Sequence, residues 1–193
     1  MAELPLRAVS PLHHPRPLES AAVAINEMTG LQMASLATGP AARPALIEAV
    51  RRHWGVDLPL TPRRVTGGSD AFLWAGPDRW MVTSSAPADL EQSLRASVGA
   101  GPAITDQTDG RCLLRVSGPK ARATLAKLLP IDLHPRAFAP NHTALTVAIH
   151  VNLQIWQLDD TPAYDISLFR GYADYFHHAL IEAAAEFAPN AHP

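Results

Sequence analysis

The chain has 193 residues, 47% of them hydrophobic and 18% charged, and its formal net charge is −2. This composition is typical of a globular protein, and the length suffices for one large domain or two small ones. A nearly neutral charge without a basic run argues against a nucleic-acid partner. The chain has neither a secretory signal pattern nor a stretch near the ~18 apolar residues of a membrane span, so we expect a cytoplasmic protein without a membrane partner.

Four prolines fall within the first 19 residues, namely Pro5, Pro11, Pro15 and Pro17. They interrupt helical and strand periodicity, and proline favours extended backbone. We therefore predict an extended N-terminal arm over residues 1–22, either disordered alone or laid along a partner.

The next segment, residues 23–108, is predicted to form a first ferredoxin-like unit. Proline near the start of each helix and glycine after its end delimit two helices. A polar connection through Gly67-Gly68-Ser69 separates the first helix from a hairpin. The expected elements are strands at 23–28 and 31–37, a helix from Pro44 to Gly55, a hairpin of 71–74 and 80–83, a helix from Pro87 to Gly99, and a strand at 103–108.

Residues 109–193 repeat this order of elements and are predicted to form a second ferredoxin-like unit, with negligible sequence identity to the first. The expected elements are a strand at 111–116, a helix over 119–129, strands near 143–149, 151–158 and 163–169, and a last helix over about 172–187 that buries Tyr172, Phe176, Leu180 and Ala183. The fold class is thus α+β. We expect the two units to pack closely, sharing one sheet or exchanging an edge strand.

Cys112 is the only cysteine, so the chain has no disulfide framework. A catalytic role would require an accessible thiolate beside a base. Cys112 instead shares the apolar face of its strand with Leu114 and Val116, and free cysteine is among the most buried residue types. We predict a core residue.

Other polar clusters also favour structural roles. The adjacent histidines His13-His14 and His177-His178 suit a metal poorly, because neighbours on a helix point about 100° apart. Asp106 with Asp109, and Asp159-Asp160, lie beside Thr, Pro or Gly and are typical of turns. No glycine-rich run matches a phosphate-binding loop. The sequence therefore predicts no catalytic, cofactor-binding or metal-binding residue in this chain.

An irregular loop is predicted after Pro130, because proline ends the preceding helix. The loop is apolar, its prolines limit how it folds back, and Arg136 has no acid in the same segment. An arginine beside an aromatic ring is a common interface anchor. We therefore predict a partner-docking surface made of Leu133, His134, Pro135, Arg136 and Phe138. The alternative is that the apolar side chains fold inward.

Several runs carry a family resemblance. Leu114-Arg115-Val116-Ser117-Gly118-Pro119, followed by Ala121, Leu125 and Ile131-Asp132-Leu133, resembles the motif of the folate-binding aminomethyltransferase superfamily. A narrower similarity, to the gamma-subunit family of heterotetrameric sarcosine oxidases, rests on Asp132 to Phe138, Trp156, Asp159 to Tyr164, and Tyr172-Ala173-Asp174-Tyr175. The resemblance covers most of the chain from about Leu31 onward.

This resemblance implies a cytoplasmic complex with alpha, beta and delta subunits that oxidatively demethylates sarcosine or a related N-methyl amine. It further implies that FAD, FMN, NAD, zinc and tetrahydrofolate belong to the other chains, and that this chain is a non-catalytic structural subunit. The alternative is a stand-alone folate-binding aminomethyltransferase-like protein, which would need an acidic residue in a deep central cavity. An iron–sulfur assembly factor of the same fold is disfavoured, since Cys112 lies between Arg111 and Leu113 rather than in a Lys-Gly-Cys-Tyr motif.

Overall fold

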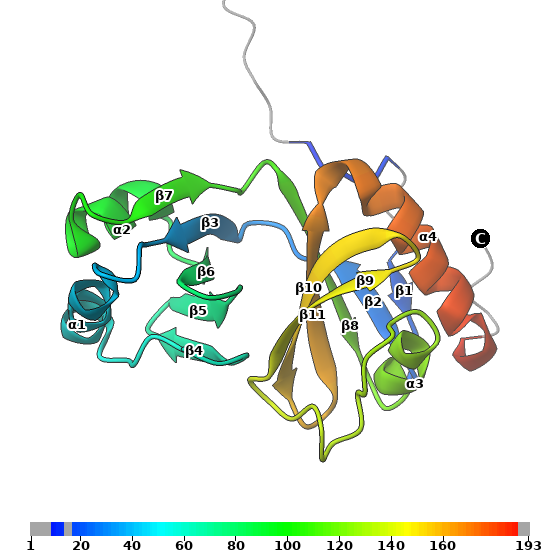
Figure 1. Ribbon diagram of the computed structural model, residues 1–193. Helices are drawn as coiled ribbons and strands as arrows, with labels where there is room; N and C mark the ends of the chain where they lie inside the picture. Colours follow the sequence, from blue (N-terminus) through cyan, green and yellow to red (C-terminus); the bar gives the residue numbers. More distant parts are fainter. Residues whose placement is uncertain (1–8, 14–16, 189–193) are drawn as a thin grey trace, which may run out of the picture.

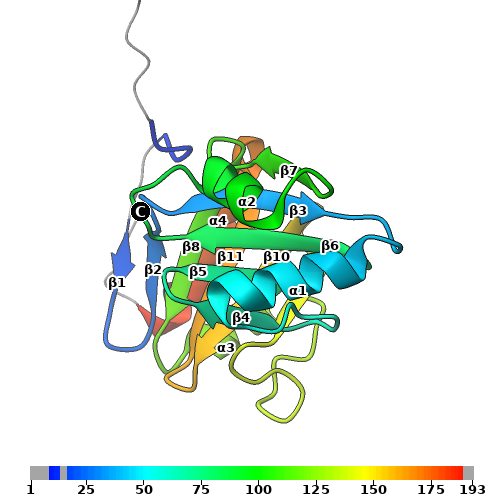
Figure 2. The same ribbon diagram turned by 90° about the vertical axis from the view of Figure 1, so that its left-hand side faces the viewer.

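The computed structural model describes residues 9–13 and 17–188, which form two antiparallel sheets with helices on their outer faces (Figure 1). The layers follow one another as helices, sheet, sheet and helices (Figure 1, Figure 2). One apolar core lies between each sheet and its helices, and a smaller one lies between the two sheets. The predicted α+β class is confirmed.

The five-stranded sheet has the order β4-β5-β6-β3-β7. Its elements match the predicted order of strand, helix, two strands, helix and strand, with β4 as an addition that the sequence pattern does not predict. The bounds are β3 Gln32–Ala37, α1 Arg43–Trp54, β4 Arg64–Gly67, β5 Asp70–Trp74, β6 Arg79–Ser84, α2 Leu90–Val98 and β7 Ala103–Asp106.

Both helices on this sheet end where the sequence predicts. Gly55 adopts the left-handed conformation with φ of 68°, and its N–H donates to the Arg51 carbonyl, so it closes α1. Gly99 follows α2 with φ of 77°. The start of α2 differs, because Asp89 caps it by accepting a hydrogen bond from Gln92 N–H, and Pro87 lies outside the helix.

The six-stranded sheet has the order β1-β2-β8-β11-β10-β9. Two helices, α3 and α4, cover its outer face, and a short 3-10 turn lies at each end of α4. The bounds are β1 Leu18–Glu19, β2 Ala24–Glu27, β8 Arg111–Ser117, α3 Ala121–Ala126, β9 Thr143–Ala148, β10 Val151–Asp159, β11 Ala163–Phe169, the turn Arg170–Tyr172, α4 Ala173–Ala184 and the turn Ala185–Phe187.

Strand β2 corrects the predicted boundary between the units. The sequence division assigns residues 23–28 to the first unit, but β2 pairs with β8 of the second sheet, where Ile25 lies opposite Val116. The Met28 N–H also donates to the Leu113 carbonyl at 2.8 Å. Local alternation predicts a strand but not its partner, and here the partner is chosen by the larger core, in which Val23 and Ile25 are fully buried.

The predicted N-terminal arm is also corrected where the structure describes it; residues 1–8 and 14–16 lie outside the described part. Leu12 and Leu18 are buried in the larger core, and β1 pairs with β2. The segment is extended as predicted, but it lies along its own chain, because these two leucines cover apolar surface that the second sheet otherwise leaves open.

Two helices of the second half differ in extent from the prediction. α3 covers only Ala121–Ala126, although Leu129 beyond its end is still buried. Tyr172 is 52% exposed, against the prediction, because it belongs to the 3-10 turn before α4 rather than to the helix face. Phe176, Leu180 and Ala183 are buried as predicted.

Candidate functional site

Cys112 lies in β8 with its side chain in the larger core. Burial is the main cause that raises the pKa of this thiol from about 9 to about 12, and the nearby Glu27 carboxylate acts in the same direction. The thiol is therefore neutral at physiological pH, whereas a nucleophile would need the thiolate. The predicted core role is confirmed.

The histidines do not converge. Among residues 9–13 and 17–188, no three His, Cys, Asp or Glu side chains are grouped so as to hold a metal ion. His13 bonds to Asp174 through its backbone N–H and its ring, and His178 lies 3.3 Å from Glu182. His177 is buried in α4, and His14 is outside the described residues.

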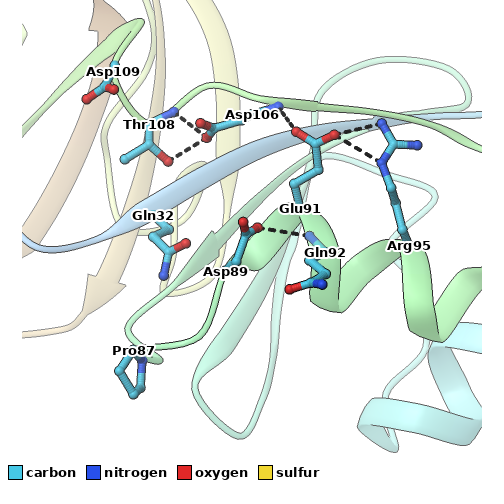
Figure 3. A pocket seen from close by; sticks show the side chains of 9 residues that line it. All are labelled: Gln32, Pro87, Asp89, Glu91, Gln92, Arg95, Asp106, Thr108 and Asp109. Carbon is cyan, nitrogen blue, oxygen red and sulfur yellow. Dashed lines mark hydrogen bonds and ion pairs between the residues drawn. The ribbon is translucent and has the colours of Figure 1, made fainter. Parts of the chain in front are cut away.

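An open hollow of about 670 Å³ lies between α2 and the segment that leaves β7 (Figure 3). It contains Asp106 and Asp109, two of the acids that the sequence suggests for turns, together with Asp89 and Glu91. Asp106 accepts hydrogen bonds from the N–H and hydroxyl of Thr108, at 2.9 and 2.7 Å. This is the turn-forming role predicted for it.

Glu91 fastens α2 to the edge of the sheet rather than facing the hollow unpaired (Figure 3). Its carboxylate accepts two hydrogen bonds from Arg95, at 3.0 and 2.7 Å, and one from the Asp106 N–H at 3.1 Å. Gln32 bonds to the backbone before α2, donating to the carbonyls of Ala86 and Ala88 and accepting from Leu90 N–H. The polar lining therefore holds secondary structure together, and it offers no paired acid and base for catalysis.

A separate, smaller cavity lies between the two sheets and is lined by the buried acid Asp165, which the sequence does not predict as a site residue. Asp165 in β11 lies opposite Arg115 in β8, and the two form a bidentate ion pair with distances of 2.7 and 2.9 Å. This pair raises the pKa of Arg115, chiefly through its hydrogen bond to Asp165. Arg64 also lines the cavity, and burial lowers its pKa although Asp165 partly offsets the effect. The sequence gives only a weak indication of this pair, because Arg115 and Asp165 lie in two predicted strands and are 50 residues apart.

We tested this cavity against a folate, the group that the superfamily resemblance implies. Its volume is about 220 Å³, below the ~300–1,000 Å³ of ordinary small-molecule sites. The Asp165 carboxylate is already paired with Arg115, and Asp70 accepts hydrogen bonds from Trp54 and Ser84. The residues present do not fit a folate.

The predicted docking loop divides into an inner and an outer part. Leu133 is 3% and Phe138 6% exposed, and both belong to the larger core. His134, Pro135 and Arg136 are exposed. A helical turn separates the two sets, since the N–H groups of Ala137 and Phe138 both donate to the His134 carbonyl at 2.8 Å. The prediction that Leu133 and Phe138 face a partner is therefore corrected, while the exposed tip stays a predicted docking surface.

The amino-acid sequence is similar to those of known proteins. The sequence model of the family described as sarcosine oxidase, gamma subunit, matches residues 38–186. The sarcosine oxidase subunit gamma of Corynebacterium sp. (strain P-1) is 34% identical over 147 residues, covering 75% of this chain and 70% of that protein. The subunit gamma of an Arthrobacter sp. is 32% identical over 153 residues, covering 78% and 73%.

Solved structures agree with the fold. A chain of the heterotetrameric sarcosine oxidase from Corynebacterium sp. U-96, in complex with pyrrole 2-carboxylate, superposes with a TM-score of 0.76 and 27% identity, covering 89% of this chain and 88% of that one. The glycine cleavage system aminomethyltransferase T from Bartonella henselae gives 0.64 at 17% identity, covering 83% of this chain and 46% of that one, which shows a shared fold. In the described part of the chain, no helix is both long and apolar enough to traverse a bilayer.

Proposed function

Because this chain belongs to the sarcosine oxidase gamma subunit family, we propose that it is the non-catalytic gamma subunit of a cytoplasmic heterotetrameric oxidase. The complex would oxidatively demethylate sarcosine or a related N-methyl amine. Its partners would be alpha, beta and delta subunits. The observation that carries this proposal is the match along nearly the whole length of both this chain and a chain of the heterotetrameric enzyme.

A structural role is supported by how the reactive groups are used. The Cys112 thiol is buried and neutral, the Asp165 carboxylate is paired with Arg115, and Glu91 fastens α2 to β7. These three side chains are thus engaged in packing or in hydrogen bonds that hold the fold. We accordingly place FAD, FMN, NAD, zinc and tetrahydrofolate on the other subunits.

The exposed tip of the loop, His134, Pro135 and Arg136, is proposed as one contact with a partner. Its residues are exposed, while Leu133 before it and Phe138 after it are buried in the core. Arg136 is exposed and has no acidic partner among the described residues, so its charge is accessible to another chain.

The test is to express the chain alone and together with the other three subunits. The isolated chain should be colourless and inactive with sarcosine, and it should co-purify with the others in a flavin-containing complex that consumes oxygen when sarcosine is added. Flavin absorbance that stays with the isolated chain through gel filtration, or oxidation of sarcosine by that chain, would contradict the non-catalytic role.

Folate binding to the isolated chain provides the second test, because it separates this proposal from a stand-alone aminomethyltransferase-like protein. Titration calorimetry with tetrahydrofolate should give no saturable heat. Saturable binding that Asp165→Asn abolishes would favour the aminomethyltransferase-like function instead.

A further inference from the structure

A second hollow, of about 390 Å³, is lined by Ala75 and Met81 from the five-stranded half and by residues of β8, β9, β10 and β11 of the six-stranded sheet. Its rim is apolar and accessible: Leu145 and Val147 on β9 are 52% and 47% exposed, and Phe169 at the end of β11 is 48% exposed. Leu145 and Val147 are two residues apart, so both project from the same face of the edge strand. Exposed apolar groups gathered in this way are typical of interaction sites.

Arg111 lines the same hollow and is the only charged residue among the described residues that line it. Its guanidinium lies 4.7 Å from the centre of the Phe169 ring, which holds the cation in place. Its nearest hydrogen bond is a long one, 3.5 Å to the Ser167 hydroxyl, and its Nε is buried with no partner. Burial lowers the pKa of Arg111, and no carboxylate of the described residues offsets that loss.

Arg115 lies four residues further along the same face of β8 and has the carboxylate partner that Arg111 lacks. The residue opposite Arg115 on β11 is Asp165, which supplies a bidentate carboxylate. The residue opposite Arg111 is Phe169, which supplies only a ring. A half-buried guanidinium without a carboxylate is costly, and an incoming carboxylate would remove that cost while apolar side chains covered the rim.

We propose that this hollow receives an apolar segment of a partner subunit that carries a carboxylate, which pairs with the Arg111 guanidinium while the segment covers Leu145, Val147 and Phe169. The inference rests on the proposed function, since it names the surface through which this chain joins its complex. The partner's chemistry follows from the complementary charge and from the apolar rim.

The experiment uses the full chain, co-expressed with the other subunits and carrying one substitution at a time. Leu145→Asp places a negative charge on the rim and should weaken co-purification about tenfold or more, whereas Leu145→Lys should weaken it less, because it repels no carboxylate. Arg111→Gln should weaken association about tenfold, and Arg111→Lys should retain most of it.

Leu60→Asp is the matched control, because Leu60 is 56% exposed and lies outside this hollow. It should leave association within about twofold of the unmodified chain, as expected for a surface change away from an interface. All variants should melt as the unmodified chain does when isolated, so that loss of association is not loss of folding.

If the unmodified chain co-purifies and Leu145→Asp and Arg111→Gln are retained equally well, this hollow is not a docking site. The proposed function would not be affected by that result. Failure of the unmodified chain to co-purify would overturn both. A dimer of the isolated chain that Leu145→Asp dissociates, with assembly of the complex unchanged, would assign the hollow to a second copy and also overturn the proposal.

Discussion

The two halves of the molecule are built on one plan. Reading from the edge, the first sheet runs β7-β3-β6-β5-β4 and the second runs β2-β8-β11-β10-β9, with β1 added outside β2. In each, an opening strand is followed by a helix, a hairpin, a further strand and a second helix. Apart from the additional β1, the two sheets differ at one position. β7 follows its helix in the chain, whereas β2, which fills the same place beside β8, comes from the N-terminus.

This difference shows that strand position and chain order are separable. Ile25 in β2 lies opposite Val116, just as Ile104 in β7 lies opposite Leu36, and all four are buried. The geometry requires an apolar strand there, but not one from the neighbouring sequence. The first sheet is consequently contiguous in sequence, and the second depends on a segment made before the first.

Removing residues 1–28 should destabilise the second sheet more than any other change, because it deletes β1 and β2 and leaves the first sheet complete. The deletion takes away Leu12, Leu18, Val23 and Ile25 from the larger core. At ~1.5–3 kcal/mol each, the loss approaches the ~5–15 kcal/mol by which a whole domain is stable. The truncated chain should lose the cooperative urea transition of the six-stranded sheet, and adding a synthetic peptide of residues 9–28 should restore it. A truncated chain with unchanged melting would show that β2 is dispensable.

The connections between the first helix and the hairpin offer a second comparison. In the first half, Leu58 is buried and the Pro59 carbonyl accepts a hydrogen bond from Trp80 Nε1 at 2.7 Å. In the second half, Leu133 and Phe138 are buried in the same connection. Phe138→Ala should lower the free energy of unfolding by ~3–5 kcal/mol and Leu58→Ala by ~2–5 kcal/mol, measured by urea denaturation of the isolated chain.

Arg136→Ala is the control for the loop, because its side chain is exposed. Its effect on unfolding should stay within about 0.5 kcal/mol, while its co-purification with the other subunits reports on the proposed tip contact. If Phe138→Ala left melting unchanged, the loop would not be anchored as the structure shows.

Cys112 and Gln32 occupy equivalent places in β8 and β3, four residues before Val116 and Leu36. Gln32 bonds to the backbone at the start of α2, whereas Cys112 packs among apolar side chains. Cys112→Ser should therefore cost ~1–3 kcal/mol, the penalty of burying a hydroxyl without a partner, and should not change turnover per assembled complex. A lost turnover with unchanged melting would instead indicate a chemical role.

The same thiol makes stability depend on alkaline pH. Its pKa is about 12 in the folded chain and about 9 when unperturbed. The unfolded chain therefore loses this proton first, so the contribution to stability is complete below pH 9 and is lost as the pH rises toward 12. Comparing the melting of the unmodified chain and Cys112→Ala between these limits isolates the effect, since the alanine variant lacks it.

The smallest expected effect concerns the hairpin turns. The β4–β5 turn has Gly68 at positive φ, 63°, whereas the β9–β10 turn has Ile149 and His150 at 43° and 70°. A non-glycine residue in this region costs of order 1 kcal/mol. His150 is exposed, so His150→Gly should raise the free energy of unfolding by up to about 1 kcal/mol. Gly68→Ala should lower it, and a drop in both variants would mean that His150 makes a stabilising contact.

Sequence periodicity predicts most elements of this fold, because amphipathic patterns are local. Alternation places the strands near 111–116 and 163–169, and glycine ends α1 at Gly55. Pairing is not local, which is why sequence periodicity places residues 23–28 in the first unit although β2 pairs with β8 of the second sheet. β4 is missed for another reason. Pro59 and Pro62 before it and Gly67 at its end are typical of a loop, yet pairing with β5 makes residues 64–67 a strand.

The sites show the same limit. The neighbours of Cys112 on its strand are enough to predict that it is a core residue. The sequence does not distinguish Asp165 from any other polar residue in a strand, because its role depends on the pairing of β11 with β8, which places it opposite Arg115. For the loop, composition identifies Leu133 and Phe138 as too apolar for water, and only the helical turn at His134 shows that both fold inward. Likewise, the lack of a carboxylate opposite Arg111 depends on strand register.

The position of β2 in the chain also determines when during translation the second sheet can be completed. Glu27 pairs with Leu114 and Ala24 with Ser117, so the ribosome must add about 90 residues after β2 before this strand pairs with β8. At ~5–20 residues per second, that interval is roughly 5–20 s, during which the first sheet, contiguous between Gln32 and Asp106, can already form. Meanwhile Val23 and Ile25 have no core to enter, and an unpaired apolar strand is an aggregation hazard. Slower elongation lengthens that exposure, so the yield of folded chain should depend on translation rate and on chaperones that bind the nascent N-terminal segment.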